Sequence, residues 1–235
     1  MRRIIFALLL SLASTSVINS QNIASTAQED EASSNIVKDT NIDIIRQIRA
    51  AWKTDTLLVE NAFPKARIRN FAKAFCNSHP NYPPNAALTD YLRDIGHYSY
   101  EEKHYIIIDE PSSGYIKCDM GGQFDFLTCL CYWKRSGGHN LVAVLMQIAN
   151  EGETCDSELL FYDFNPATST MLPDLEVQQT VDALLKQHPG SQFIRLPEEG
   201  KDISVSVANW SEDEADIIFD DFLLQWTGNT FKFAK

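Results

Sequence analysis

The sequence predicts an α+β fold, in which N-terminal helices pack on an antiparallel β-meander that contains one inserted helix. Apolar residues recur at helical spacing up to about residue 95, and short apolar runs separated by turn residues follow from residue 104. Helices followed by a run of strands are typical of the α+β class. We expect the meander to form a strongly bent sheet or a small sandwich.

The clearest hairpins are expected in the middle of the chain. Three apolar strands alternate there with two glycine turns, at residues 115–120, 121–122, 123–133, 136–138 and 139–150. Residues 141–146 show no alternation of apolar and polar side chains, which is typical of a central strand covered on both faces. A two-residue turn at Gly121 and Gly122 would place Cys118 opposite Asp125.

The remaining elements are predicted from periodicity, caps and turn residues. Helices are expected at residues 44–52 after a Thr40 or Asn41 cap, from Pro64 to Cys76, from Asn85 to Ile95, and from Pro173 to Leu185. Further strands are expected at residues 104–109, 157–164, 169–172, 192–196, 203–207, 217–226 and 230–233. Two four-strand groups can be drawn, within residues 104–150 and within residues 157–233.

The N-terminus has the pattern of a secretory signal peptide. Arg2 and Arg3 precede an apolar run at residues 4–12, which is too short to span a bilayer as a helix. We predict a signal peptide at residues 1–20, a polar flexible linker at residues 21–38, and a single α+β domain at residues 39–235. The mature chain is therefore expected to be exported and soluble, in the periplasm or outside the cell.

Composition limits the partners of the mature chain. The sequence contains 32 Asp and Glu residues against 20 Lys and Arg residues, and its formal net charge is −12. A field of this sign repels nucleic acids and anionic lipids. We expect a protein or carbohydrate ligand in the cell envelope, no nucleic acid, no transmembrane segment in the mature chain, and no cofactor.

Two of the five cysteines are the first catalytic candidates. Cys129 and Cys131 lie two residues apart on one expected strand, so they share a face and do not readily form a disulfide with each other. Either thiol is a candidate nucleophile with His139 as its base, and Asp125 is a candidate carboxylate inside an apolar hairpin. Mid-strand cysteines lack the cationic surroundings that activate a thiol, so buried free thiols are the favoured interpretation. For Asp125, a position on the solvent-facing side is favoured.

No metal site is predicted. Cys76 and His79 have the spacing of half a site, but no second Cys/His pair completes it. Lys65, Arg69 and Lys73 form a basic ridge on one helix face, which we expect to be solvated or paired with carboxylates of the same protein.

The lack of recognisable catalytic motifs favours a binding function. Gly-x-Ser-x-Gly, His-Glu-x-x-His and Gly-x-x-x-x-Gly-Lys do not occur in the sequence. Aromatic residues on loops are common recognition anchors. Tyr82, Tyr98, Tyr100 and Trp210 are expected to be exposed at turns, and Trp210, Tyr98 and Tyr100 are the binding candidates. The leading prediction is an exported, non-catalytic binding or interaction module of the cell envelope. The alternative is a hydrolase of envelope or other polymers that uses carboxylates or a Cys–His pair.

The layout of the chain resembles the exported proteins of unknown function that abound in Bacteroidetes genomes. The signal peptide, the polar linker and the ending Trp226-x-Gly228-x-x-Phe231 carry this resemblance. It implies residence in the envelope or outside the cell, and it transfers no catalytic residue to this sequence.

Overall fold

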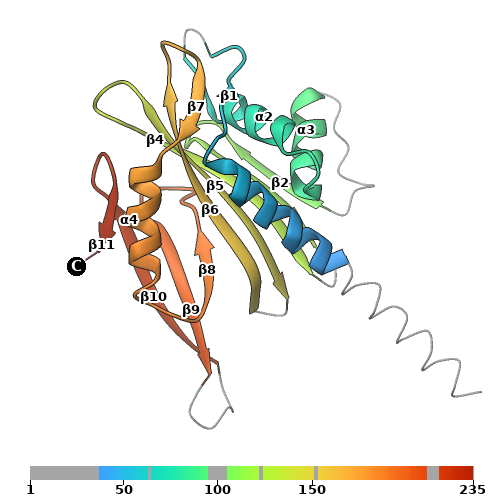
Figure 1. Cartoon of the computed structure of the whole chain (residues 1–235), viewed down its shortest axis with the longest axis vertical. Coiled ribbons are helices and arrows are strands. Elements are labelled where there is room, and N and C mark those ends of the chain that lie inside the picture. The colour runs from blue at the N-terminus through green and yellow to red at the C-terminus, as the bar shows by residue number, and fades with distance from the viewer. Residues whose placement is uncertain are drawn as a thin grey trace, which may run out of the picture. The chain divides into compact units, whose positions relative to one another are not determined.

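The computed structural model describes residues 37–62, 65–94, 105–121, 124–150, 153–210 and 217–234. These residues form helices and two antiparallel sheets, which confirms the predicted α+β class. Helices cover one face of the larger sheet, and the smaller sheet with one further helix covers part of the other face (Figure 1). The predicted signal peptide lies outside the described residues.

The larger sheet has seven strands in the described part of the chain, in the order β1-β7-β6-β5-β4-β3-β2. Its strands are β1 (Leu57–Leu58), β2 (Tyr105–Glu110), β3 (Tyr115–Met120), β4 (Asp125–Lys134), β5 (Asn140–Asn150), β6 (Glu153–Asn165) and β7 (Thr170–Pro173). The central strand is β5, and its residues 141–146 are each at most 1% exposed. The prediction of a central strand covered on both faces is therefore confirmed.

Each face of the larger sheet has its own apolar core. Val142 and Val144 of β5 point toward the helices and share a core with Trp52. Leu141 and Leu145 point the other way and join a second core with α4 (Leu175–Leu185) and the smaller sheet. Because successive side chains of a strand alternate between faces, one strand serves both cores and a three-layer arrangement results.

The smaller sheet has the strand order β11-β10-β9-β8. Its strands are β8 (Ser191–Arg195), β9 (Ile203–Trp210), β10 (Ile217–Trp226) and β11 (Phe231–Phe233). The four-strand group predicted within residues 157–233 corresponds to β8 to β11 and does not begin at residue 157. The strands β6 and β7 belong to the larger sheet, because β6 pairs with β5 along most of its length and β7 turns back onto β6. The two-residue strand β1, which the sequence pattern does not predict, pairs with β7 at the edge of the larger sheet.

The helices begin at residues that differ from those predicted. Residues 37–52 are helical, so Thr40 and Asn41 lie within this first helix and do not cap it. The helix α2 (Ile68–Ser78) begins four residues later than predicted, after an N-cap at Arg67. The helix α4 begins two residues after the predicted start at Pro173, and Asp174 caps it, because its Oδ1 accepts a hydrogen bond from Val177 N at 3.0 Å.

The helix α3 (Pro83–Arg93) also has a different start. Pro83 occupies its first turn, where a missing N–H costs nothing, and the N-cap is Tyr82. Asn85, predicted as the cap, is instead fully buried. Its Nδ2 donates to the carbonyl oxygen of His79 at 2.9 Å, and its Oδ1 accepts from the Thr128 hydroxyl at 2.7 Å. This tertiary contact fixes α3 on β4.

The connection between β3 and β4 is longer than the predicted two-residue turn. Met120 pairs with Phe126, so five residues connect the paired positions. Cys118 therefore lies opposite Thr128, and the predicted pairing with Asp125 is wrong.

The predicted basic ridge on α2 is paired with acidic residues. Arg69 Nε lies 2.7 Å from Asp109 Oδ2, and Lys73 Nζ lies 2.9 Å from Glu60 Oε2. Arg69 and Lys73 are therefore paired with carboxylates of the same protein, as one of the two predicted possibilities states. None of the helices in the described part is both long and apolar enough to cross a membrane.

Candidate functional site

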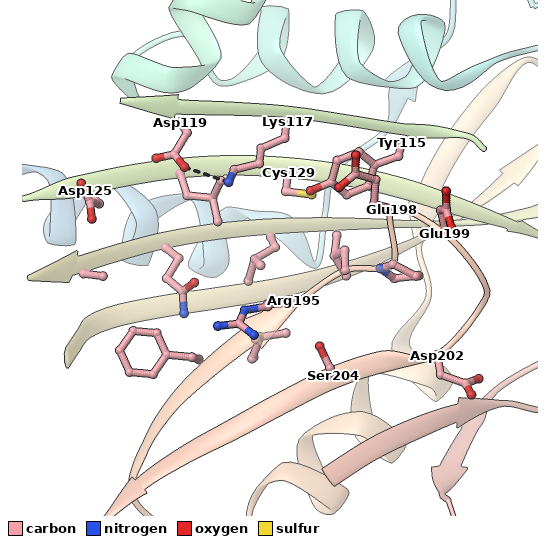
Figure 2. Close-up of a pocket in the computed structure, with 18 residues that line it drawn as sticks. Tyr115, Lys117, Asp119, Asp125, Cys129, Arg195, Glu198, Glu199, Asp202 and Ser204 are labelled. Atoms are coloured by element: carbon pink, nitrogen blue, oxygen red, sulfur yellow. Dashed lines mark ion pairs between the residues drawn. The ribbon is translucent and has the colours of Figure 1, made fainter. Parts of the chain in front are cut away.

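A cleft of about 650 Å³ lies between the two sheets (Figure 2). One wall consists of side chains from β3, β4 and β5 of the larger sheet. The other wall consists of β8, the start of β9 and residues 196–202, which connect these two strands. Its volume falls within the range typical of small-molecule and peptide sites in proteins.

Side chains from both faces of β8 line the cleft, and β8 lies at the edge of the smaller sheet. Along β8 and β9, Ile194 and Val205 are paired with each other and buried in the core with α4. Their neighbours Arg195 and Ser204 form the next pair and project from the opposite face of the smaller sheet. Both of them line the cleft, and Figure 2 shows them across from the side chains of β3.

Two hydrogen bonds hold the walls together. Gln147 Nε2 of β5 donates to the carbonyl oxygen of Gln192 in β8 at 3.3 Å. Trp133 Nε1 of β4 donates to the carbonyl oxygen of Lys201, in the connection between β8 and β9, at 2.8 Å. The shape of the cleft is therefore supported on both sides before any ligand binds.

The lining combines an apolar floor with an excess of acidic groups. Leu145, Ile194 and Leu196 are buried and contribute the apolar part. Five carboxylates and two cations line the cleft, namely Asp119, Asp125, Glu198, Glu199 and Asp202 with Lys117 and Arg195. The formal charge of the lining is therefore 2 − 5 = −3, which favours a ligand with at least one positive charge.

Some of these charges are already satisfied by the protein. Lys117 Nζ lies 2.8 Å from Asp119 Oδ2, on the wall formed by β3. Asp202 Oδ1 accepts a hydrogen bond from Trp226 N at 3.0 Å. Asp125, Glu198 and Glu199 are exposed and make no ion pair within the described part of the chain. These three carboxylates are available to a ligand.

The cysteine on the cleft floor is a neutral thiol. Cys129 is buried beside Tyr115, whose hydroxyl donates a hydrogen bond to the sulfur, and burial raises the pKa of Cys129 to about 12. Burial likewise raises the pKa of Cys131 well above its ordinary value. Cys76, Cys118, Cys129 and Cys131 are all free and buried, as the sequence pattern favours. A thiol in this state is a weak nucleophile near neutral pH.

His139 is held at a different place, in a second cavity of about 490 Å³. Its Nδ1 lies 2.6 Å from Asp163 Oδ2. Cys131 pairs with Ala143, four residues along the chain from His139, which corresponds to roughly 13 Å at the rise of a strand. The proposed Cys–His pair is therefore not assembled in this structure.

The other candidate residues have the following places. Asp125 begins β4 and is exposed at the cleft, which agrees with the predicted solvent-facing position. Trp210 ends β9 opposite Ile217, and its side chain lies outside the described part. Tyr98 and Tyr100 also lie outside the described residues. The expected exposure of Tyr82 is wrong, because its ring is fully buried and its hydroxyl donates to the carbonyl oxygen of Gln147 at 3.0 Å. No group of three or more His, Cys, Asp or Glu side chains is placed to hold a metal ion among the residues that the structure describes.

Sequence reasoning missed the residues that now define the cleft. The sequence pattern places Lys117 and Arg195 on the predicted strands at residues 115–120 and 192–196, and Glu198 and Glu199 between two predicted strands, without assigning them to a site. In the sequence these residues share only one feature, a charged side chain next to an apolar residue. Because this pattern occurs at many solvent-exposed positions, it does not identify a binding site. The packing of β8 against the larger sheet is what brings them together.

These features define an α+β protein with a preformed, acidic cleft between two sheets. The chain matches no protein-family model, no curated protein and no solved structure.

Thiol labelling tests the burial of the cysteines. In a Cys155→Ser variant, which removes the thiol whose side chain is not described, none of the four remaining cysteines should react rapidly in the folded protein. All four should react after denaturation without reductant, and mass spectrometry counts the labels. Rapid labelling of Cys129 or Cys131 in the folded protein would contradict their burial and favour thiol chemistry.

Proposed function

We propose that this protein is an exported, non-catalytic binding module of the cell envelope, and that its ligand occupies the cleft between the two sheets. The observation that carries this proposal is the composition of the cleft, in which an apolar floor is combined with three exposed carboxylates that lack ion-pair partners in the described part. Such a lining recognises a ligand by shape and charge. Export rests on the N-terminal sequence pattern.

The alternative function, a polymer hydrolase, receives less support. A Cys–His enzyme needs a thiolate within hydrogen-bonding distance of the imidazole, whereas Cys129 is neutral and His139 contacts Asp163. A carboxylate hydrolase needs one carboxyl group that stays protonated near neutral pH. Asp125 and Glu198 are instead exposed to solvent.

A pair of matched substitutions on β9 tests the location of the site. Ser204 lines the cleft, whereas Ser206 lies two residues further along the same face and outside it. Ligand-observed NMR with libraries of short peptides and oligosaccharides would identify ligands of the wild-type chain. Ser204→Trp should fill the cleft and abolish their binding, and Ser206→Trp should leave binding within about twofold of wild type.

Two results would contradict this proposal. Binding that survives Ser204→Trp unchanged would place the ligand elsewhere. Ligands that are recovered as cleavage products would favour the hydrolase, and the expected result is that they are recovered intact.

A further inference from the structure

We infer that the cleft binds a peptide with a free C-terminal carboxylate, which Arg195 holds, and with a lysine or arginine side chain, which Glu198 or Glu199 holds. This inference rests on the proposed function, because it names the chemistry of the ligand in the same cleft. It depends on three features of the described residues. Arg195 has no carboxylate partner, Glu198 and Glu199 line the same cleft without an ion pair, and the floor of the cleft is apolar.

Arg195 is an arginine without a carboxylate partner in a strongly acidic protein. Seven arginines lie in the described part, and five of them pair with Asp or Glu: Arg46, Arg49, Arg69, Arg93 and Arg135. Arg67 and Arg195 have no such pair within the described residues, and of these two only Arg195 lines the cleft. Its charge is therefore free to bind a ligand.

A carboxylate is the group that best fits Arg195. The planar guanidinium presents parallel N–H donors that match a carboxylate in a bidentate arrangement. Lys117 lines the opposite wall and adds a second positive charge, although it is paired with Asp119. The lining as a whole has a formal charge of −3, which disfavours a phosphate dianion or any polyanion. A ligand with one carboxylate and one positive group nearby can pair with Arg195 and is not repelled by the net negative lining.

The remaining carboxylates specify the positive group. Glu198 and Glu199 lie directly after β8, in the connection that closes the cleft next to Arg195 (Figure 2). Glu198 and Glu199 follow Arg195 by three and four residues, which at about 3.3 Å per residue is at most roughly 13 Å of chain. A lysine one or two residues before the C-terminus of an extended peptide covers this length with its backbone and its long side chain. Leu127, Leu145 and Phe193 supply apolar contacts for the last side chain of the peptide.

An acidic sugar shares the carboxylate but fits the cleft less well. A uronic acid has no cation for the exposed carboxylates and no aliphatic side chain for the floor. Binding of carboxylate-bearing sugars is therefore the competing outcome of the test.

Matched peptide pools provide the test. Tetrapeptides with lysine at the second position and Leu, Phe or Val at the last are made with either a free C-terminal carboxylate or an amide, and binding to the full chain is titrated by NMR. The acids should bind roughly tenfold more tightly than the amides, as expected for a charge-assisted hydrogen bond. The preference for the acid over the amide should vanish in Arg195→Gln. It should be smaller than in the wild type in Arg195→Lys, which keeps the positive charge but lacks the parallel N–H donors of the guanidinium. Arg67→Gln is the control, because it removes an arginine that has no carboxylate partner in the described part and lies outside the cleft. This variant should retain the preference for the acid.

A second comparison tests the positive group. Replacing the lysine of the peptide by norleucine should weaken binding to the wild-type chain by roughly tenfold but should have little effect in a Glu198→Gln, Glu199→Gln double variant. Because these side chains are exposed, the variants should fold like the wild type. Thermal unfolding of each variant checks this.

The outcomes separate this inference from the proposed function. Equal binding of acids and amides that is still lost in Ser204→Trp would overturn the inference and leave the cleft as the site. Failure of both pools to bind, or binding only of an oligouronate, would also overturn it. Peptide binding that Ser204→Trp does not affect would overturn both.

Discussion

Replacing Arg135 with methionine should lower the free energy of unfolding by about 3 kcal/mol or more. The guanidinium lies 2.6 Å from Asp163 Oδ1 and 2.6 Å from Asp174 Oδ2, and its side chain is 15% exposed. Removal of one partner from a largely buried ion pair leaves the other charge uncompensated, and here two carboxylates lose the guanidinium, while Asp163 keeps its contact with His139 Nδ1. Urea unfolding of the variant and the wild type at neutral pH measures the difference.

The position of Arg135 explains why the effect should be global. This residue follows β4, whereas Asp163 belongs to β6 and Asp174 caps α4. Arg135 also donates to the carbonyl oxygen of Asn229, between β10 and β11, at 3.1 Å. One side chain therefore connects the larger sheet, α4 and the smaller sheet, and its loss weakens the contact between layers.

Arg93 provides the control for this prediction. It pairs with Asp90 on the surface of α3, where its side chain is 69% exposed. Arg93→Met should change stability by less than about 0.5 kcal/mol, as is common for exposed pairs. Adding Asp163→Asn to Arg135→Met should recover part of the lost stability, because it removes one uncompensated charge. A wild-type-like Arg135→Met protein would show that the network contributes nothing.

Stability should fall as the pH rises from about 4.5 to about 7 because of Glu158. Burial is the main cause that raises the pKa of this β6 carboxyl to about 7, and the neighbouring Asp156 and Asp182 add to it. Arg49, whose Nε lies 3.5 Å from Glu158 Oε2, and Arg46 act in the opposite direction. The folded state thus favours the neutral carboxyl group.

The sign of the effect follows from proton linkage. Between the two pKa values the folded protein binds more protons than the unfolded chain, so the free energy of unfolding decreases with increasing pH. The contribution of Glu158 is fully present below the unfolded pKa, and it is lost as the pH rises through the folded pKa. Its upper limit is about 3 kcal/mol, since each pKa unit corresponds to about 1.4 kcal/mol.

Glu158→Gln tests this assignment, because glutamine imitates the neutral carboxyl group. The variant should show a much flatter stability profile across this pH range and should be at least as stable as the wild type at about pH 8. Glu60→Gln is the control, since Glu60 is 62% exposed and pairs with Lys73 on the surface. If Glu158→Gln keeps the full decrease of the wild type, another group is responsible.

The hairpins could be predicted because their information is local. Residues 115–120 form β3 as predicted, and the predicted strand at residues 139–150 differs from β5 by a single residue. The start of α3 and the connection between β3 and β4 could not be predicted in this way. Asn85 reads as a cap, yet its side chain is buried because it bonds to Thr128, which lies 43 residues away in the sequence.

The same distinction applies to the candidate site. The burial of Cys129 follows from its apolar neighbours, so the sequence indicates a thiol of low reactivity. The partner of His139 could not be predicted, because Asp163 reaches it only through the pairing of β5 with β6.

The sequence by itself determined the class of fold, the order of the strands along the chain and the central position of β5. These properties follow from turn residues and from the alternation of apolar side chains, which act between near neighbours. Only the tertiary structure decided which strands share a sheet, and therefore where Lys117, Arg195 and Glu198 meet. The cleft lies between the two sheets, and its geometry depends on how β8 packs against a surface formed by residues far away in the sequence.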